Sequence, residues 1–171
     1  ALAGRHLIQS QIVSVALFGS QVSRYPLAIY LPFIKTISKL WLQTKKYIIS
    51  SKFGPEAEPR GIGQEYIRWA GWLTRWKSTK GVSYWKALQD ISLPVIAFAA
   101  KNDKGDPAKH CEKLLNGFSG IKSFHLLARN KGFSMDYTHG KMVKSEQAEQ
   151  EVWPLLINWL KTLKENKQEK V

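Results

Sequence analysis

Three short apolar runs, spread along the chain, have the pattern of buried β-strands. They comprise residues 12–18, 93–100 and 121–127, and they are rich in branched and aromatic side chains. Runs of this length and composition are typical of strands inside a sheet. Between the second and third runs the sequence predicts a helix from Pro107 to Leu115. Because strands alternate with helices, we expect an α/β fold with a mostly parallel sheet.

The two ends of the chain are also patterned as helices. Residues 145–163 place apolar side chains on one stripe of an amphipathic helix: Val152, Leu155, Leu156, Trp159, Leu160 and Leu163. Residues 1–10 are mostly small and apolar, which indicates the end of a helix. Residues 164–171 are polar, and we expect this tail to be frayed.

A long segment, residues 21–89, interrupts the alternation of strands and helices. It contains two helical patterns, Pro32 to Ile49 and Gln64 to Trp76, joined by a Gly/Pro-rich link from Phe53 to Gly63 that we expect to act as a hinge. Five of the seven tryptophans lie in it: Trp41, Trp69, Trp72, Trp76 and Trp85. The segment is too well patterned to be a loop. We predict a helical cap inserted into an α/β core formed by residues 1–20 and 90–171.

The first cap helix has a basic and an apolar side. Its apolar side carries Phe33, Ile34, Ile37, Trp41 and Ile48, and four lysines lie elsewhere. Such a stripe usually packs on a protein core, and we favour that interpretation. A basic amphipathic helix can also lie on an anionic membrane, so a peripheral membrane contact through the basic cap stays open.

Composition places the chain among globular proteins. Its 171 residues are 44% hydrophobic and 23% charged, enough for one domain with a sizeable core. A single cysteine, Cys111, excludes an internal disulfide and fits a reducing, cytoplasmic compartment. The longest apolar stretch, Tyr25 to Leu42, is broken by prolines and lysines, and we expect no membrane-spanning helix.

The chain is strongly basic, and the excess is uneven. The net charge is +13. Residues 1–90 contain thirteen Lys/Arg and four acidic residues (13 − 4 = +9). Residues 91–171 contain thirteen Lys/Arg and nine acidic residues (13 − 9 = +4). This excess indicates either an anionic partner or, as we favour, a solvated basic face. Zinc-finger, RNP-like and helix-turn-helix patterns are missing, so we expect no nucleic-acid partner. No metal, nucleotide or other cofactor site is predicted.

An acid and a histidine follow successive strands in the order of a Ser–Asp–His hydrolase. Asp103 comes after the second apolar run, and His139 comes after the third, 36 residues later (139 − 103). The chain contains no G-x-S-x-G turn. Ser20 ends a strand but has Val22 where such a turn needs a small residue, so we interpret it as a turn residue. Adjacent helical residues point in different directions, which makes a His110/Cys111 nucleophilic pair improbable. The remaining histidines, His6 and His125, lie in a predicted helix and strand and fit structural roles.

Two aspartates compete for the acid role. Asp106 precedes Pro107, a favoured first residue of a helix, and its carboxylate is expected to cap that helix. Asp103 lies at the mouth of the strand, where the ligand-facing groups of open α/β sheets gather. We therefore assign Asp106 to structure and Asp103 to chemistry.

The stretch from Pro94 to His139 resembles the α/β-hydrolase superfamily. Its strand Pro94–Ala100 and loop Lys101–Pro107 are similar to the family's P-V-L-x-x-x-G strand and G-x-x-D-x-x-x-P loop, with Ala100 in place of the usual glycine. Residues 151–160 look like the final helix of capped members, and residues 1–4 look like the helix that leaves the nucleophile turn.

The resemblance implies a fold, partners and roles. It implies that Asp103 orients His139, that His139 is the general base, and that serine and oxyanion hole belong to an N-terminal half of the fold outside this chain. Three strands are too few for the fold, and the first would present an unpaired edge. The implied substrate is an ester-like small molecule, and the chain by itself should be inactive. If the cap opens, its aromatic underside would form an apolar acyl or alcohol pocket, which suggests a hydrophobic ester or amide. The alternative is a non-catalytic, basic accessory or membrane-surface binding protein.

Overall fold

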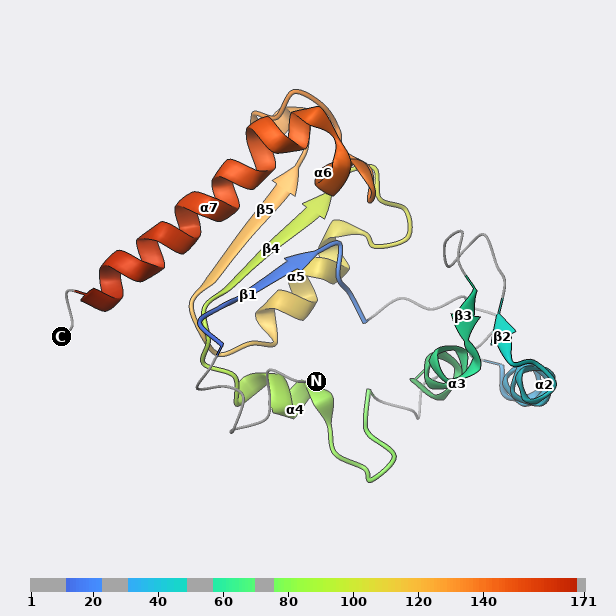
Figure 1. The fold of residues 1–171 in the computed structure, drawn as a ribbon. Helices are drawn as coiled ribbons and strands as arrows, with labels where there is room; N and C mark the ends of the chain where they lie inside the picture. The colour runs from blue at the N-terminus through green and yellow to red at the C-terminus, as the bar shows by residue number, and fades with distance from the viewer. Residues whose placement is uncertain (1–11, 23–30, 49–56, 70–75, 169–171) are drawn as a thin grey trace. The chain divides into compact units, whose positions relative to one another are not determined.

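The computed structural model describes residues 12–22, 31–48, 57–69 and 76–168 (Figure 1). The chain divides into two compact units, one of residues 1–24 with 86–171 and the other of residues 25–85. These limits differ by four residues at each end from the boundaries expected for a core and an inserted cap (24 − 20 and 90 − 86). The helix predicted at residues 1–10 lies outside the described residues.

The first unit is built on a three-stranded parallel sheet. Strands β1 (Val15–Phe18), β4 (Val95–Ala100) and β5 (Lys122–Leu127) lie side by side in the order β1-β4-β5 (Figure 1). All six residues of the central β4 are buried, as expected of a continuous apolar strand covered on both faces. The predicted mixed α/β architecture with parallel strands is thus confirmed. Among the described strands, β1 pairs with β4 alone.

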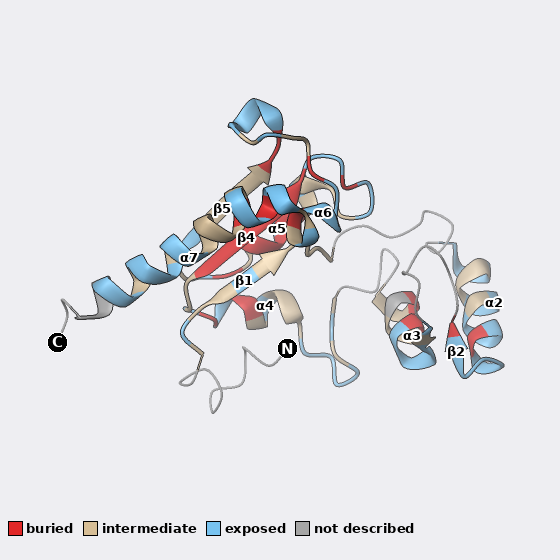
Figure 2. Cartoon of the chain, turned by 45° about the horizontal axis from the view of Figure 1, so that its top comes forward, coloured by how far each residue is buried: buried red, intermediate tan, exposed pale blue. Residues whose placement is uncertain are grey.

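Helices flank the sheet. Helices α6 (Lys141–Lys144) and α7 (Glu146–Gln168) cover one face, where a buried cluster joins strand and helix side chains: Ile96, Phe98, Ala100, Leu127, Met142, Ala148 and Val152. Successive residues of a strand point to opposite faces. The alternate residues of β4 therefore face α5 (Ala108–Asn116), which contacts β4 and buries Cys111, Leu114 and Leu115. In Figure 2 the buried residues concentrate in β4, and the outer surfaces of α5 and α7 are exposed.

The helix predicted from Pro107 to Leu115 is confirmed within one residue at each end, as α5. The predicted end of the final helix was wrong. This helix does not fray after Leu163 but continues to Gln168, because Lys, Glu and Gln are good helix formers. Residues 169–171 lie outside the described residues.

The described part of the second unit includes the helices α2 and α3 and a short antiparallel strand pair. Helix α2 (Pro32–Gln43) is followed by β2 (Tyr47–Ile48), which pairs with β3 (Glu58–Pro59), and α3 (Arg60–Trp69) comes next. Its small core is formed by Leu42, Ile48 and Ile67. Gly63 of α3 lies so close to Ile48 that a Cβ there would overlap the isoleucine side chain.

Several predictions for this segment were wrong. The first helix ends at Gln43 rather than Ile49, and the chain reverses into β2. The glycines predicted as hinge material, Gly61 and Gly63, lie inside α3. The absence of a side chain permits close packing at Gly63, whereas a Cβ on Gly61 would meet no atom within 4 Å. The predicted single apolar stripe is divided, because Leu42 and Ile48 face the core while Phe33, Ile37 and Trp41 are exposed.

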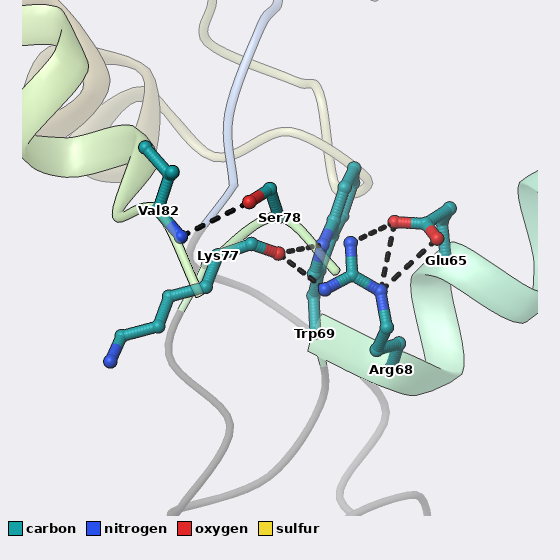
Figure 3. Close-up of polar contacts among 6 residues, drawn as sticks. All are labelled: Glu65, Arg68, Trp69, Lys77, Ser78 and Val82. Atoms are coloured by element: carbon teal, nitrogen blue, oxygen red, sulfur yellow. Dashed lines mark hydrogen bonds and ion pairs between the residues drawn. The ribbon is translucent and has the colours of Figure 1, made fainter. Parts of the chain in front are cut away.

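Polar and aromatic contacts tie the later part of the second unit together (Figure 3). Arg68 and Trp69 both donate to the carbonyl oxygen of Lys77, Trp69 through Nε1 at 3.2 Å. Arg68 also pairs with Glu65, with its Nε 3.1 Å from each carboxylate oxygen. Aromatic rings pack edge to face beside these bonds, with 6.3 Å between the centroids of Trp69 and Trp76. The segment after residue 75 is thereby attached to the end of α3. Helix α4 (Tyr84–Gln89) follows it.

None of the described helices has both the length and the apolar character needed to cross a bilayer.

Candidate functional site

Asp103 is held rigidly at the carboxyl end of β4. Its backbone N–H donates to the carbonyl of Ala100 at 3.2 Å, which turns the chain away from the sheet. Its side-chain Oδ1 accepts two backbone N–H groups, from Gly105 at 3.0 Å and Asp106 at 2.9 Å. The side chain is only 5% exposed. Because these bonds occupy Oδ1, the orientation of the carboxylate and the direction of Oδ2 are set.

The other carboxylate oxygen of Asp103 meets His139. His139 Nδ1 lies 2.6 Å from Asp103 Oδ2, across 36 residues of sequence. An ionised carboxylate can only accept a hydrogen bond, so Nδ1 carries the proton and Nε2 is left as the basic nitrogen. The imidazole is 58% exposed. The pair that the sequence predicts is therefore in contact, with a buried acid behind an accessible imidazole.

A second carboxylate lies at the same histidine. Asp106 Oδ2 is 3.3 Å from His139 Nδ1, and the Asp106 side chain is 28% exposed. The cap position of helix α5 is Pro107, whose side chain makes no capping hydrogen bond. That Asp106 caps this helix stays a prediction, and its carboxylate also reaches the imidazole. The D-x-x-D spacing was the sequence signal for this placement.

The backbone of Gly19 lies against the imidazole of His139. It follows β1 and has a left-handed backbone, with φ of 53°. A Cβ on Gly19 would lie 2.7 Å from His139 Nδ1 and equally close to the methyl group of Met142. Real Cβ atoms do not approach this closely, so His139 can occupy its position only over glycine. Sequence reasoning missed this role, although a glycine directly after a strand was a weak signal.

The loop that carries His139 is anchored two residues earlier. Tyr137 is fully buried, and its hydroxyl donates to Glu151 Oε2 of α7 at 2.9 Å. Its carbonyl accepts the backbone N–H of Asn102 at 2.8 Å, which connects the two loops of the site. Burial, followed by the nearby Glu151 carboxylate, raises the pKa of Tyr137 to about 12. The phenol therefore remains a donor throughout the physiological pH range.

The other residues weighed from the sequence lie in structural settings. Ser20 Oγ donates to the carbonyl of Phe18 at 3.2 Å, as in a strand-end turn. Cys111 is buried, and burial followed by Asp106 and Asp103 raises the pKa of its thiol to about 12. His125 stacks on Phe98 with 5.3 Å between ring centroids and lies 3.0 Å from Ser123 Oγ. His6 lies outside the described residues.

No protein-family model and no curated protein matches this chain.

The three site residues could also hold a divalent cation. One ligand atom from each of Asp103, Asp106 and His139 lies within 4.8 Å of the others. Two carboxylates and an imidazole suit several divalent metals. However, Nδ1 and the Asp103 carboxylate are bonded directly to each other, so a cation on these atoms would have to break that bond. The geometry present is that of an acid–imidazole pair, which can accept a proton at Nε2 from a reactant.

Proposed function

We propose that this chain is the C-terminal part of an α/β-hydrolase-type serine hydrolase, with Asp103 and His139 as the acid and base of a Ser–Asp–His triad. The observation that carries the proposal is the 2.6 Å contact between His139 Nδ1 and the buried Asp103 carboxylate. The two residues follow neighbouring parallel strands, β4 and β5, at the edge of a sheet where such triads are built.

In this proposal each residue has a defined task. His139 Nε2 takes the proton from the serine hydroxyl as it attacks the carbonyl carbon, and later returns it to the leaving group. Asp103 keeps the proton on Nδ1 and stabilises the imidazolium. The two backbone N–H groups on Asp103 Oδ1 hold the acid in place. Asp106 adds a second negative charge near the imidazolium, and Gly19 provides the space for the ring.

The proposal places the nucleophile in another part of the enzyme. The 171 residues contain no G-x-S-x-G turn, and β1 has an edge that no described strand occupies. A strand carrying the serine would pair with that edge. The proposed substrate is a small ester-like molecule with a hydrophobic acyl group, with residues 21–89 as the cap.

The decisive experiment combines gene sequence and kinetics. The coding DNA upstream of Ala1 should encode an apolar strand and a G-x-S-x-G turn. The complete protein should hydrolyse p-nitrophenyl esters, and Asp103→Asn and His139→Gln should each lower kcat by at least about 10³-fold. Asp90→Asn, in the turn between α4 and β4, is the matched control and should retain activity. Unchanged kcat in both site variants would disprove the triad. Absence of esterase activity in the complete wild-type protein would favour a non-catalytic accessory protein.

A further inference from the structure

Helix α2 presents a second apolar face that the second unit does not bury. Its inner side packs on α3 through Leu42. On the outer side lie four apolar residues at helical spacing, each 52–63% exposed: Phe33, Ile37, Leu40 and Trp41. Most globular helices bury one apolar stripe and expose polar residues elsewhere. An exposed face of this kind marks an interaction site for a protein, a membrane or a ligand.

A basic, aromatic hollow adjoins the C-terminal end of this face. It is lined by Lys45, Lys46, Tyr47 and Arg60, among others. The Lys45 ammonium lies 5.8 Å from the ring centroid of Trp41, and the Lys46 ammonium lies 5.6 Å from that of Tyr47. Tyr47 is half exposed. Cations and interface-seeking aromatic rings are thus gathered next to the apolar face.

The charge of this part of the chain is one-sided. Residues 31–48 contain four lysines and no acid. Residues 25–85 contain ten Lys/Arg and three Glu, a net of +7 (10 − 3), and one of these acids, Glu65, pairs with Arg68. None of the described residues that line the hollow is acidic. The surface is therefore complementary to a dense array of negative charges.

We propose that the outer face of α2 and the adjoining hollow form a docking surface for anionic phospholipid bilayers. An acidic protein without an apolar patch would satisfy the lysines but would leave Phe33 and Ile37 in water. A bilayer with anionic headgroups meets both requirements, because the apolar side chains enter the acyl boundary and the cations remain at the phosphates. Trp41 and Tyr47 are the residue types that favour this boundary. The inference does not rest on the proposed hydrolase function.

The experiment measures co-sedimentation of the protein with two kinds of vesicle. Phosphatidylcholine vesicles containing phosphatidylserine should bind it, with weaker binding at high salt, and pure phosphatidylcholine vesicles should bind it poorly. Lys45→Gln/Lys46→Gln should lower the partition coefficient about 30-fold, because each lysine near such a surface contributes about fivefold. The charge-matched control is Lys161→Gln/Lys164→Gln on α7, where both lysines are exposed. This pair should change partition much less.

A second pair of variants tests the apolar face. Phe33→Gln/Ile37→Gln should weaken vesicle binding at high salt, whereas Ile157→Gln/Leu160→Gln, also at exposed positions, should not. If the two double-lysine variants lost vesicle binding equally, the binding would be explained by the net charge of the protein alone, and the proposal would be overturned. A large drop in thermal stability for Phe33→Gln/Ile37→Gln would likewise overturn it, because the face would then be packed within the protein.

Discussion

The imidazole of His139 lies directly over the backbone of Gly19. The Gly19 N–H donates to the carbonyl of Phe98 at 2.9 Å, which fixes the end of β1 against β4. The φ of 53° and the 2.7 Å separation between a hypothetical Cβ and Nδ1 both exclude a larger residue. The first strand thus contributes to the site through the absence of a side chain.

Replacing this glycine should damage the site more than the fold. Gly19→Ala would displace the imidazole from Asp103, and we expect kcat of the complete enzyme to fall about 10²-fold. Gly132→Ala is the control, because Gly132 also has a positive φ, of 91°, but its Cβ would meet no atom within 4 Å. It should lower stability by about 1 kcal/mol and leave kcat unchanged. Equal kcat losses in the two variants would contradict a steric role for Gly19.

The two carboxylates at His139 should contribute unequally. An amide at position 103 that keeps its oxygen on the two backbone N–H groups turns its NH₂ toward Nδ1, which forces the imidazole into the wrong tautomer. Asp106 makes a longer contact and is partly solvated, so Asp106→Asn should lower kcat at most about fivefold. Steady-state kinetics of both variants tests this order. A larger loss from Asp106→Asn would reassign the acid.

The hydroxyl of Tyr137 should stabilise the loop that carries His139. Tyr137→Phe removes a buried donor to the Glu151 carboxylate and should lower the free energy of unfolding by about 1–2 kcal/mol. Urea denaturation measures the change. Tyr47→Phe, at an exposed position, is the control and should alter stability by less than about 0.5 kcal/mol. If both substitutions changed the free energy of unfolding by similar amounts, the hydrogen bond from Tyr137 to Glu151 would not stabilise the loop specifically.

His125 should make stability depend on pH. Burial lowers its pKa below the ordinary value of 6.5. Between the lowered pKa of the folded state and 6.5, the unfolded chain binds more protons at His125 than the folded chain does. The contribution of the neutral imidazole to the free energy of unfolding is therefore complete above about pH 6.5 and is lost as pH falls toward the folded-state pKa. The free energy of unfolding, measured by urea denaturation across this pH range, should rise with pH, and His125→Phe should reduce the slope of that rise. An unchanged slope in the variant would mean that other groups cause the pH dependence.

The thiol of Cys111 should be inert in the folded protein. With a pKa of about 12 and almost no exposed surface, it carries little thiolate at neutral pH. Iodoacetamide should therefore label the protein only after unfolding, and mass spectrometry can follow a single site because the chain has one cysteine. Rapid alkylation of the folded protein would reopen a nucleophilic role for Cys111.

Local patterns accounted for much of the first unit and less of the second. The apolar run of β4 and the stripe of α7 are long and regular, and both elements form where they are predicted. The second unit was harder, because its core is small and depends on a close approach of Gly63 to Ile48 that no periodicity reveals. Gly61 and Gly63 suggested a hinge on propensity alone, but both lie in helix α3, where Gly63 packs against Ile48.

The order of elements in the sequence was enough to predict that Asp103 and His139 would meet, because the carboxyl ends of neighbouring parallel strands share one edge of the sheet. Only the tertiary structure decided which other groups reach the imidazole. Asp106 and Gly19 join it through the turn at residues 103–106 and the backbone at the end of β1. Such contacts depend on φ angles and side-chain directions across segments far apart in sequence, and the identity of the residues does not specify them.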